Sequence, residues 1–206
     1  MIQVWRTSLP VAPASGEETA FSFGPPEAAE LFDAGSRAYT AGRYGEALQA
    51  WDGAYDVSPL PQLRCHQAAC LDRLGLPELA AQRYEAYLAE APDAADAHAV
   101  RAQAEILHEQ AREAAQAASE RGHAAAAQGL WREAAWAHAQ AHEQLPLPAF
   151  LLDQADALER AGDRPRAARC LQQVLDAHPE RPDAPALRAR IDALAGASRN
   201  RPPSGA

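Results

Sequence analysis

Metal binding is the first chemistry that the residue types of this chain suggest. Cys65, His66 and Cys70 lie within a short stretch of one predicted helix. His66 and Cys70 are four residues apart and share a helix face, but Cys65 points elsewhere and no fourth ligand has suitable spacing. His138 and His142 are also four residues apart, but the Glu that directly follows the first His in a metalloprotease helix is missing. We therefore expect no metal site and no cofactor.

Catalytic motifs are also missing from the sequence. It contains neither a Gly-x-Ser-x-Gly nucleophile motif nor a glycine-rich phosphate loop after a strand, and no strand is predicted. Paired carboxylates such as Asp153 and Asp156 lie on predicted helices without the pattern of a deep pocket. We therefore expect that the protein is not an enzyme.

Composition and charge narrow the choice of partner and compartment. The chain has 206 residues, a net charge of −9 and no basic stripe, so nucleic acid is not an expected partner. Its three cysteines lack the spacing of a disulfide framework. No basic and apolar leader and no run of about 18 apolar residues is present. We expect a cytoplasmic protein with reduced thiols and no membrane contact.

Glycine and proline divide most of the chain into four stretches of similar layout. A glycine ends the first predicted helix of each stretch, where φ above zero is cheap only for glycine. These four are Gly42, Gly75, Gly129 and Gly162. A proline follows the second predicted helix, which it cannot continue because it lacks the N–H donor. These four are Pro59, Pro92, Pro146 and Pro179.

Small and bulky residues at helical spacing are expected to pack the paired helices together. Ala47, Trp51 and Ala54, for example, recur at i, i+4 and i+7, which is one face of a helix. Small residues on the first helix let the second approach closely. The other expected packing positions are Leu31, Gly35, Ala80, Tyr84, Gly122, Ala134 and Ala167.

These features resemble the tetratricopeptide repeat (TPR) family. The first stretch, "LFDAGSRAYTAGRYGEALQAWDGAYDVSP", carries the resemblance most completely, and the match covers about residues 28–92 and 115–179. The resemblance implies an all-α fold, a TPR-like helical solenoid of antiparallel helix pairs. The repeats are expected at about 28–60, 61–93, 115–147 and 148–180.

A longer period lies above the repeats. A shift of 87 residues places Gly42 on Gly129 and Pro59-Leu60-Pro61 on Pro146-Leu147-Pro148. The chain therefore reads as two tandem copies of a two-repeat unit, each followed by an extra helix. Because no Gly or Pro stands between Pro92 and Gly122, the first extra helix is predicted to continue into the third repeat. The expected segments are a flexible extension (1–26), the solenoid (27–195, with extra helices at about 96–114 and 184–195) and a disordered tail (196–206).

The resemblance also implies where a partner binds. In TPR proteins the first helix of each repeat lines a concave face, and exposed positions there select the ligand. On this chain these positions hold Phe32, Ser36, Tyr39, His66, Asp72, Arg73, Glu120, His123, Asp153, Asp156 and Glu159. Asp156 and Arg160 also have the spacing of a solvated pair, and Arg160 is the only expected counter-charge near the acidic run. Trp131 and Trp136 are expected to pack between helices.

The sequence therefore predicts a protein–protein interaction module. It would act as an adaptor or scaffold that binds a peptide or another protein, with basic residues on the partner complementing the acidic chain. Two alternatives stay open. One is a small cytoplasmic TPR chaperone of a bacterial secretion system, and the other is an assembly protein that associates with itself.

Overall fold

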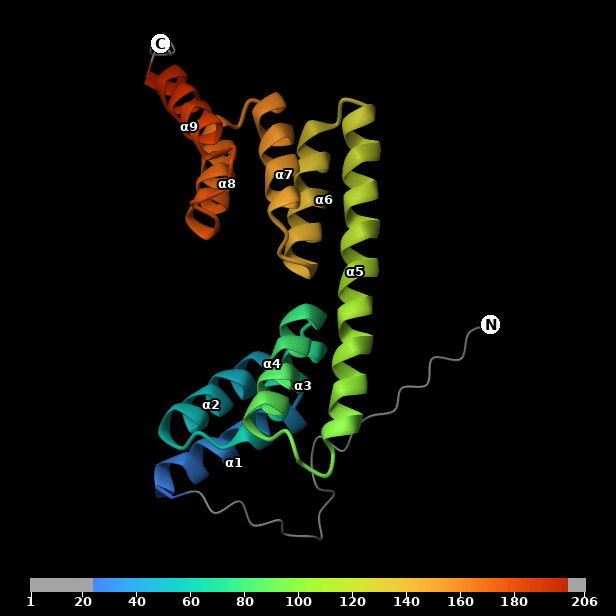
Figure 1. Cartoon of the computed structure of the whole chain (residues 1–206), viewed down its shortest axis with the longest axis vertical. Coiled ribbons are helices and arrows are strands. Elements are labelled where there is room, and N and C mark those ends of the chain that lie inside the picture. The colour runs from blue at the N-terminus through green and yellow to red at the C-terminus, as the bar shows by residue number, and fades with distance from the viewer. Residues whose placement is uncertain (1–23, 200–206) are drawn as a thin grey trace, which may run out of the picture. The chain divides into compact units, whose positions relative to one another are not determined.

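The structure, a computed structural model, describes residues 24–199 (side chains to residue 196), and this part of the chain is helical apart from short turns (Figure 1). The helices are α1 (Pro26–Thr40), α2 (Tyr44–Val57), α3 (Pro61–Arg73), α4 (Pro77–Glu90), α5 (Ala97–Ala127), α6 (Trp131–Gln144), α7 (Pro148–Arg160), α8 (Arg164–Ala177) and α9 (Ala184–Arg199). Consecutive helices from α1 to α4, and again from α6 to α9, pack against one another. The predicted all-α, TPR-like arrangement of antiparallel helix pairs is confirmed.

The chain divides into two compact units, and the boundary falls inside α5. Unit 1 extends to Gln110 and unit 2 begins at Ala111. The expected extra helix at 96–114 and the first helix of the third repeat form this one helix of 31 residues. Its sequence is rich in alanine and other strong helix formers and has no Gly or Pro before Gly122, so the helix continues into the third repeat, as its sequence predicts.

The predicted start of the C-terminal tail is wrong. Helix α9 continues to Arg199, past the expected boundary at 196, and no proline stands between Leu194 and Arg199 to end it earlier. Residues 1–23, which make up most of the predicted flexible extension, and residues 200–206 lie outside the described residues.

Turn residues explain where the paired helices begin and end. Four helices begin with proline as their first residue, where a missing N–H donor is not felt: α1, α3, α4 and α7. The tight turns inside the pairs need a left-handed residue. Glycine supplies it at Gly42 (φ 75°), Gly75 (φ 77°), Gly129 (φ 74°) and Gly162 (φ 81°).

The core of unit 1 is built around Trp51 on α2. Trp51 is only 2% exposed, and its Nε1 donates a hydrogen bond to the Phe32 carbonyl at 3.2 Å. Gly35 on α1 faces this ring: a Cβ at Gly35 would lie 2.5 Å from the indole nitrogen. Ala47 and Ala54 on α2 are fully buried. The ring can therefore enter the helix pair only because α1 carries no side chain at position 35.

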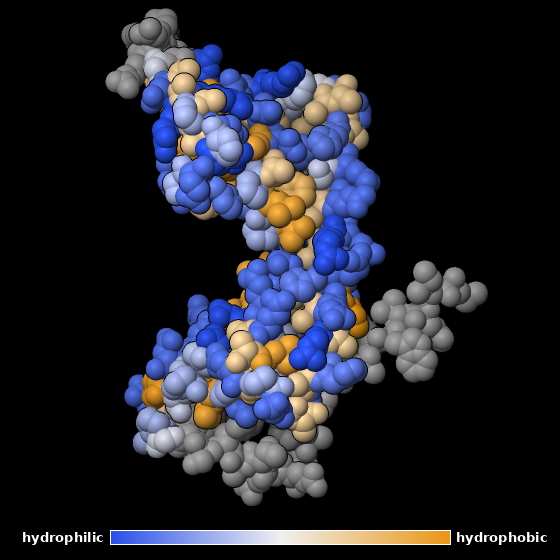
Figure 2. All heavy atoms as spheres, in the orientation of Figure 1, coloured by the Kyte–Doolittle hydropathy of each residue, from blue (hydrophilic) through white to orange (hydrophobic). Residues whose placement is uncertain are grey.

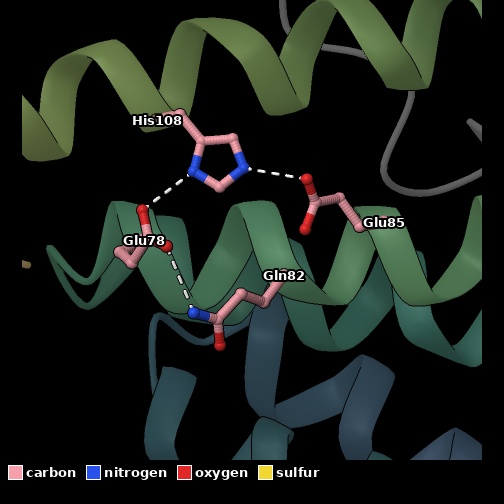
Figure 3. Close-up of polar contacts among 4 residues, drawn as sticks. All are labelled: Glu78, Gln82, Glu85 and His108. Carbon is pink, nitrogen blue, oxygen red and sulfur yellow. Dashed lines mark hydrogen bonds and ion pairs between the residues drawn. The ribbon is translucent and has the colours of Figure 1, made fainter. Parts of the chain in front are cut away.

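A histidine on α5 joins that helix to α4 within unit 1. His108 Nδ1 lies 2.8 Å from Glu78 Oε2, and its Nε2 lies 3.0 Å from Glu85 Oε1 (Figure 3). Gln82 donates a further hydrogen bond to Glu78 at 3.2 Å. Burial by itself lowers the pKa of His108, but the two carboxylates more than offset this and raise the pKa above its usual value. The imidazolium form therefore bridges two acidic residues one helix away.

Replacing Trp51 should strongly destabilise unit 1. Trp51→Ala is expected to lower the free energy of unfolding by about 3–5 kcal/mol, because a large buried ring is lost from a well-packed site. Trp136→Ala is the matched control, since the Trp136 side chain is 63% exposed. It should change stability by less than about 0.5 kcal/mol. Urea unfolding followed by far-UV circular dichroism measures both, and equal losses would contradict the assigned core.

The His108 bridge should make stability depend on pH. Because the folded pKa is raised, the stabilisation is fully present below the unfolded pKa of about 6.5 and is lost as pH rises through the folded pKa. His108→Gln should therefore destabilise the protein more at about pH 5.5 than at about pH 8.5. His98→Gln, at an exposed position of the same helix, is the control. A difference between wild type and His108→Gln that is the same at both pH values would rule out the bridge.

Candidate functional site

In unit 1 the predicted aromatic binding residues surround Trp51. The ring centroids of Phe32 and His66 lie 6.3 Å and 4.8 Å from that of Trp51, and the centroid of Tyr39 lies 5.6 Å from it. All three side chains are half-buried. The Ser36 hydroxyl donates to the Phe32 carbonyl at 2.9 Å, inside its own helix. The rings of Phe32, Tyr39 and His66, which were predicted to bind a partner, thus use much of their surface for packing inside unit 1.

The remaining predicted residues of unit 1 are more accessible. Asp72 and Arg73 are exposed at the end of α3. A hydrogen bond with Tyr39 is the main cause that raises the pKa of the Arg73 guanidinium. This end of α3 therefore offers one carboxylate and one tethered cation to solvent.

In unit 2 the predicted carboxylates form one surface, here called the α7 acidic face and defined by Asp153, Asp156 and Glu159. The side chains of these residues are 40%, 58% and 40% exposed. Arg190 on α9 reaches across to two of them. Its Nη2 lies 2.5 Å from Asp156 Oδ1 and 2.6 Å from Glu159 Oε2.

The expectation that Arg160 is the only counter-charge of this face is wrong. Arg190, which lies 30 or more residues away in sequence, pairs with the acidic residues instead. The guanidinium of Arg160 sits over the ring of Trp131, 4.8 Å from its centroid, in a cation–π contact. Sequence spacing cannot reveal the role of Arg190, because only the packing of α7, α8 and α9 brings it to this face.

Two shallow hollows border the α7 acidic face. One, of about 370 Å³, is lined by Asp156, Glu159, Arg160 and Arg190. The other, of about 300 Å³, shares Asp156 and Arg160 and reaches the buried His138. Glu120 on α5 lines a further hollow, which His123 also borders, and it accepts a hydrogen bond from Gln116 at 2.9 Å. The structure thus groups four of the five predicted unit 2 residues, since His123 lines the second hollow as well.

Three potential metal ligands converge in the second hollow. His123 on α5, His138 on α6 and Asp153 on α7 each offer a donor atom within 4.8 Å of the others. The ring centroids of the two histidines are 5.0 Å apart, and His123 Nε2 lies 3.6 Å from Asp153 Oδ2. His138 is 2% exposed, and its Nδ1 has no hydrogen-bond partner. Burial lowers the pKa of His138, which keeps the ring neutral.

His138 belongs to none of the binding sites predicted from the sequence. His123, His138 and Asp153 are 15 residues apart on three different helices, so no local motif joins them. The internal duplication could have pointed to His138, because the 87-residue shift aligns it with the buried Trp51. A histidine at a position where the other copy buries a tryptophan indicates that the core of unit 2 differs from that of unit 1.

The cysteine and histidine cluster of α3 has a different character. Burial raises the pKa of both Cys65 and Cys70 to about 12, so neither thiol ionises at neutral pH. A protonated thiol is a poor nucleophile and a poor metal ligand. Within residues 24–196, the three side chains that bring donor atoms together are those of His123, His138 and Asp153.

Trp136 is the most exposed large side chain among the described hydrophobic residues. It lies on α6 with 63% of its surface exposed, so the expectation that it packs between helices is wrong. Together with Arg132, Leu158 and Pro165 it borders a hollow of about 500 Å³. In the view of Figure 2 the surface is mostly hydrophilic, with hydrophobic residues interspersed. An exposed tryptophan on such a surface is a second candidate contact point.

Comparison with known proteins gives likenesses in fold only. No model of a known protein family matches the chain, and no curated protein matches it. A solved MamA protein is 17% identical and covers 73% of this chain and 91% of its own, with a TM-score of 0.37. TTC0263, a thermophilic TPR protein of Thermus thermophilus, is 20% identical, covers 82% of this chain and 98% of its own, and has a TM-score of 0.34.

A further likeness is YrrB, described as a TPR protein with an unusual peptide-binding site. It is 15% identical, covers 84% of this chain and 92% of its own, and has a TM-score of 0.36. Matches to TPR proteins thus extend over most of the chain, but at these identities and TM-scores they carry no argument about function. Among the described helices, none combines the length and the apolar character that crossing a membrane requires.

The close contact beneath the histidine cluster leads to a prediction. A Cβ at Gly122 would lie 2.6 Å from the His138 ring, so Gly122→Ala should destabilise the protein by about 1–3 kcal/mol. Gly53→Ala is the control, because its Cβ would meet Leu31 at an ordinary 3.5 Å inside helix α2. The control should stabilise by about 0.4–1 kcal/mol. Thermal unfolding measures both, and a gain in both would show that the ring does not lie against Gly122.

Proposed function

We propose that this chain is a protein-interaction module rather than an enzyme, and that it binds a partner segment carrying Lys or Arg. The observation that carries the proposal is the α7 acidic face. Three carboxylates project from one helix, all of them at least 40% exposed, and they border two hollows that an extended chain can enter. The adaptor or scaffold role, and the cytoplasmic location suggested by three free cysteines, belong to the same proposal.

The charge balance of the face supports a basic partner. Arg190 is the cation that pairs with Asp156 and Glu159, and such exposed pairs typically stabilise a fold by only about 0–1 kcal/mol. A Lys or Arg from a partner can therefore compete with Arg190 at little cost to the fold. Asp153, whose Oδ2 lies 3.6 Å from His123 Nε2, adds a further negative charge at the edge of the second hollow.

The hollow beside the face also offers apolar and aromatic contact. Trp131 and Ala157 line it, and Arg160 is held against the Trp131 ring. Aromatic side chains usually contribute most of the binding energy at an interface, whereas charges at the rim mainly accelerate association. In unit 1, the predicted binding roles of Phe32, Tyr39, His66, Asp72 and Arg73 stay predictions.

Site-specific crosslinking can identify the partner. A photoreactive amino acid at Glu159 is expected to capture it from extracts of the native organism. The same amino acid at Gln173, an exposed position of α8, should not capture it. Capture from both positions, or from neither, would argue against the α7 acidic face.

Charge reversal then tests the site with the purified partner. Asp156→Lys with Glu159→Lys should slow association about tenfold or more at low salt, because the attraction that steers a basic segment becomes repulsion. Glu143→Lys with Asp176→Lys, at exposed positions of α6 and α8 that are not part of this face, changes the net charge equally and is the control. Surface plasmon resonance measures both rates.

The outcomes separate this face from other surfaces. If both double variants slow association equally, the effect comes from net charge and the α7 acidic face is not the site. If neither has an effect but Trp136→Ser abolishes binding, the partner binds at the hollow beside Trp136.

A further inference from the structure

The two units differ at the place where their paired helices meet most closely. In unit 1 this place is filled by Trp51, against Gly35 of the preceding helix. The 87-residue shift places Gly122 and His138 at these positions in unit 2. A Cβ at Gly122 would approach the His138 ring as closely as one at Gly35 would approach the indole, within 2.6 Å. The same close helix contact therefore holds an imidazole where the other copy holds an indole.

The neighbours of the buried ring change in the same direction. In unit 1, Trp51 is surrounded by the rings of Phe32 and His66. By the same shift, Ser119 stands at the Phe32 position and Asp153 at the His66 position. His123 stands where unit 1 has Ser36. The exchanges remove the rings of Phe32 and His66 and bring an imidazole and a carboxylate close to the buried His138.

We propose that His123, His138 and Asp153 form a binding site for a divalent transition metal, with Zn²⁺ as the best match. Two imidazoles and one carboxylate are a donor set that Zn²⁺ accepts at about 2.0–2.2 Å, which places ligand atoms about 3.3–3.5 Å apart. His123 Nε2 and Asp153 Oδ2 are already 3.6 Å apart, and all three donor atoms lie within 4.8 Å of one another. Small side-chain rotations therefore close the site.

The buried histidine supplies an independent observation. His138 is 2% exposed, yet its Nδ1 has no hydrogen-bond partner. Buried polar atoms are nearly always paired, so an unpaired one calls for an explanation, and the capacity to bind an ion is one. In metal sites the imidazole nitrogen that does not bind the ion usually donates a hydrogen bond that orients the ring. Here Gly122 lets α5 close over the ring and fix its position.

The hollow of about 300 Å³ gives an ion access to these ligands and leaves room for a fourth. Asp156 also lines the hollow and adds negative charge. Arg160 is the one cation of its lining, and this guanidinium is held over Trp131. A bound ion would connect α5, α6 and α7, and it would leave one coordination position for water or for a group from another molecule.

Metal binding to the full chain tests the proposal. The chain is purified without a histidine tag, stripped with a chelator and titrated with Zn²⁺ alone in competition with a chromophoric chelator. We expect one Zn²⁺ per chain and a higher melting temperature at saturation. Co²⁺ in place of Zn²⁺ should give the visible absorption of a four- or five-coordinate ion.

Three variants locate the ion. His123→Ala removes an exposed ligand, and Asp153→Asn replaces a carboxylate without changing its shape. Each should weaken Zn²⁺ binding by at least about tenfold while leaving the helical circular dichroism unchanged. His178→Ala, at an exposed histidine of unit 2, should bind as wild type does. The proposal is overturned if no saturable binding occurs, or if His178→Ala weakens binding as much as the other two variants. It is also overturned if wild type, His123→Ala and Asp153→Asn bind equally well, because the ion is then adventitious.

Discussion

The packing of a ring against a helical glycine is the contact on which each unit depends. At Gly35 and at Gly122 the first helix of a pair has no side chain, and the ring of the second helix lies where a Cβ would be. The ring could not stay there if either glycine gained a methyl group, and the helices would have to separate. Buried alanines such as Ala47 and Ala134 keep the rest of each pair equally close. This contact sets the rotation and the spacing of the two helices in each pair. It therefore also decides which residues of the first helix face the solvent.

The parts of this fold that depend on neighbouring residues in the chain could be predicted from the sequence. The turns follow from glycines that need φ above zero, and the helix ends follow from proline, so both can be located residue by residue. Packing across several helices could not be predicted in the same way. Arg190 reaches Asp156 and Glu159 from more than 30 residues away. Trp136 is exposed, although its apolar ring and its place in a helix both favoured packing.

The α7 acidic face and the histidine cluster are neighbours, but they would bind their ligands through different interactions. The face attracts a partner through exposed charge, whose effect salt largely screens beyond about 10 Å. The cluster acts through donors whose geometry is imposed by buried helix packing. Asp153 belongs to both, so an ion bound there would remove one carboxylate from the charge that a partner meets. Partner binding and ion binding can nevertheless be separated by variants that leave Asp153 intact.

The abundance of alanine in the core limits which substitutions this sequence can accept during evolution. Positions such as Ala28, Ala80, Ala155 and Ala167 have no exposed surface. In a core of leucine or phenylalanine, the damaging changes are mostly those that remove atoms. Here more than half of the buried hydrophobic residues that the structure describes are alanines, which have little to lose, while almost any larger residue at these positions would push two helices apart. Selection on this chain should therefore act mainly against growth of its interior side chains, leaving substitutions on the outer helix faces comparatively free.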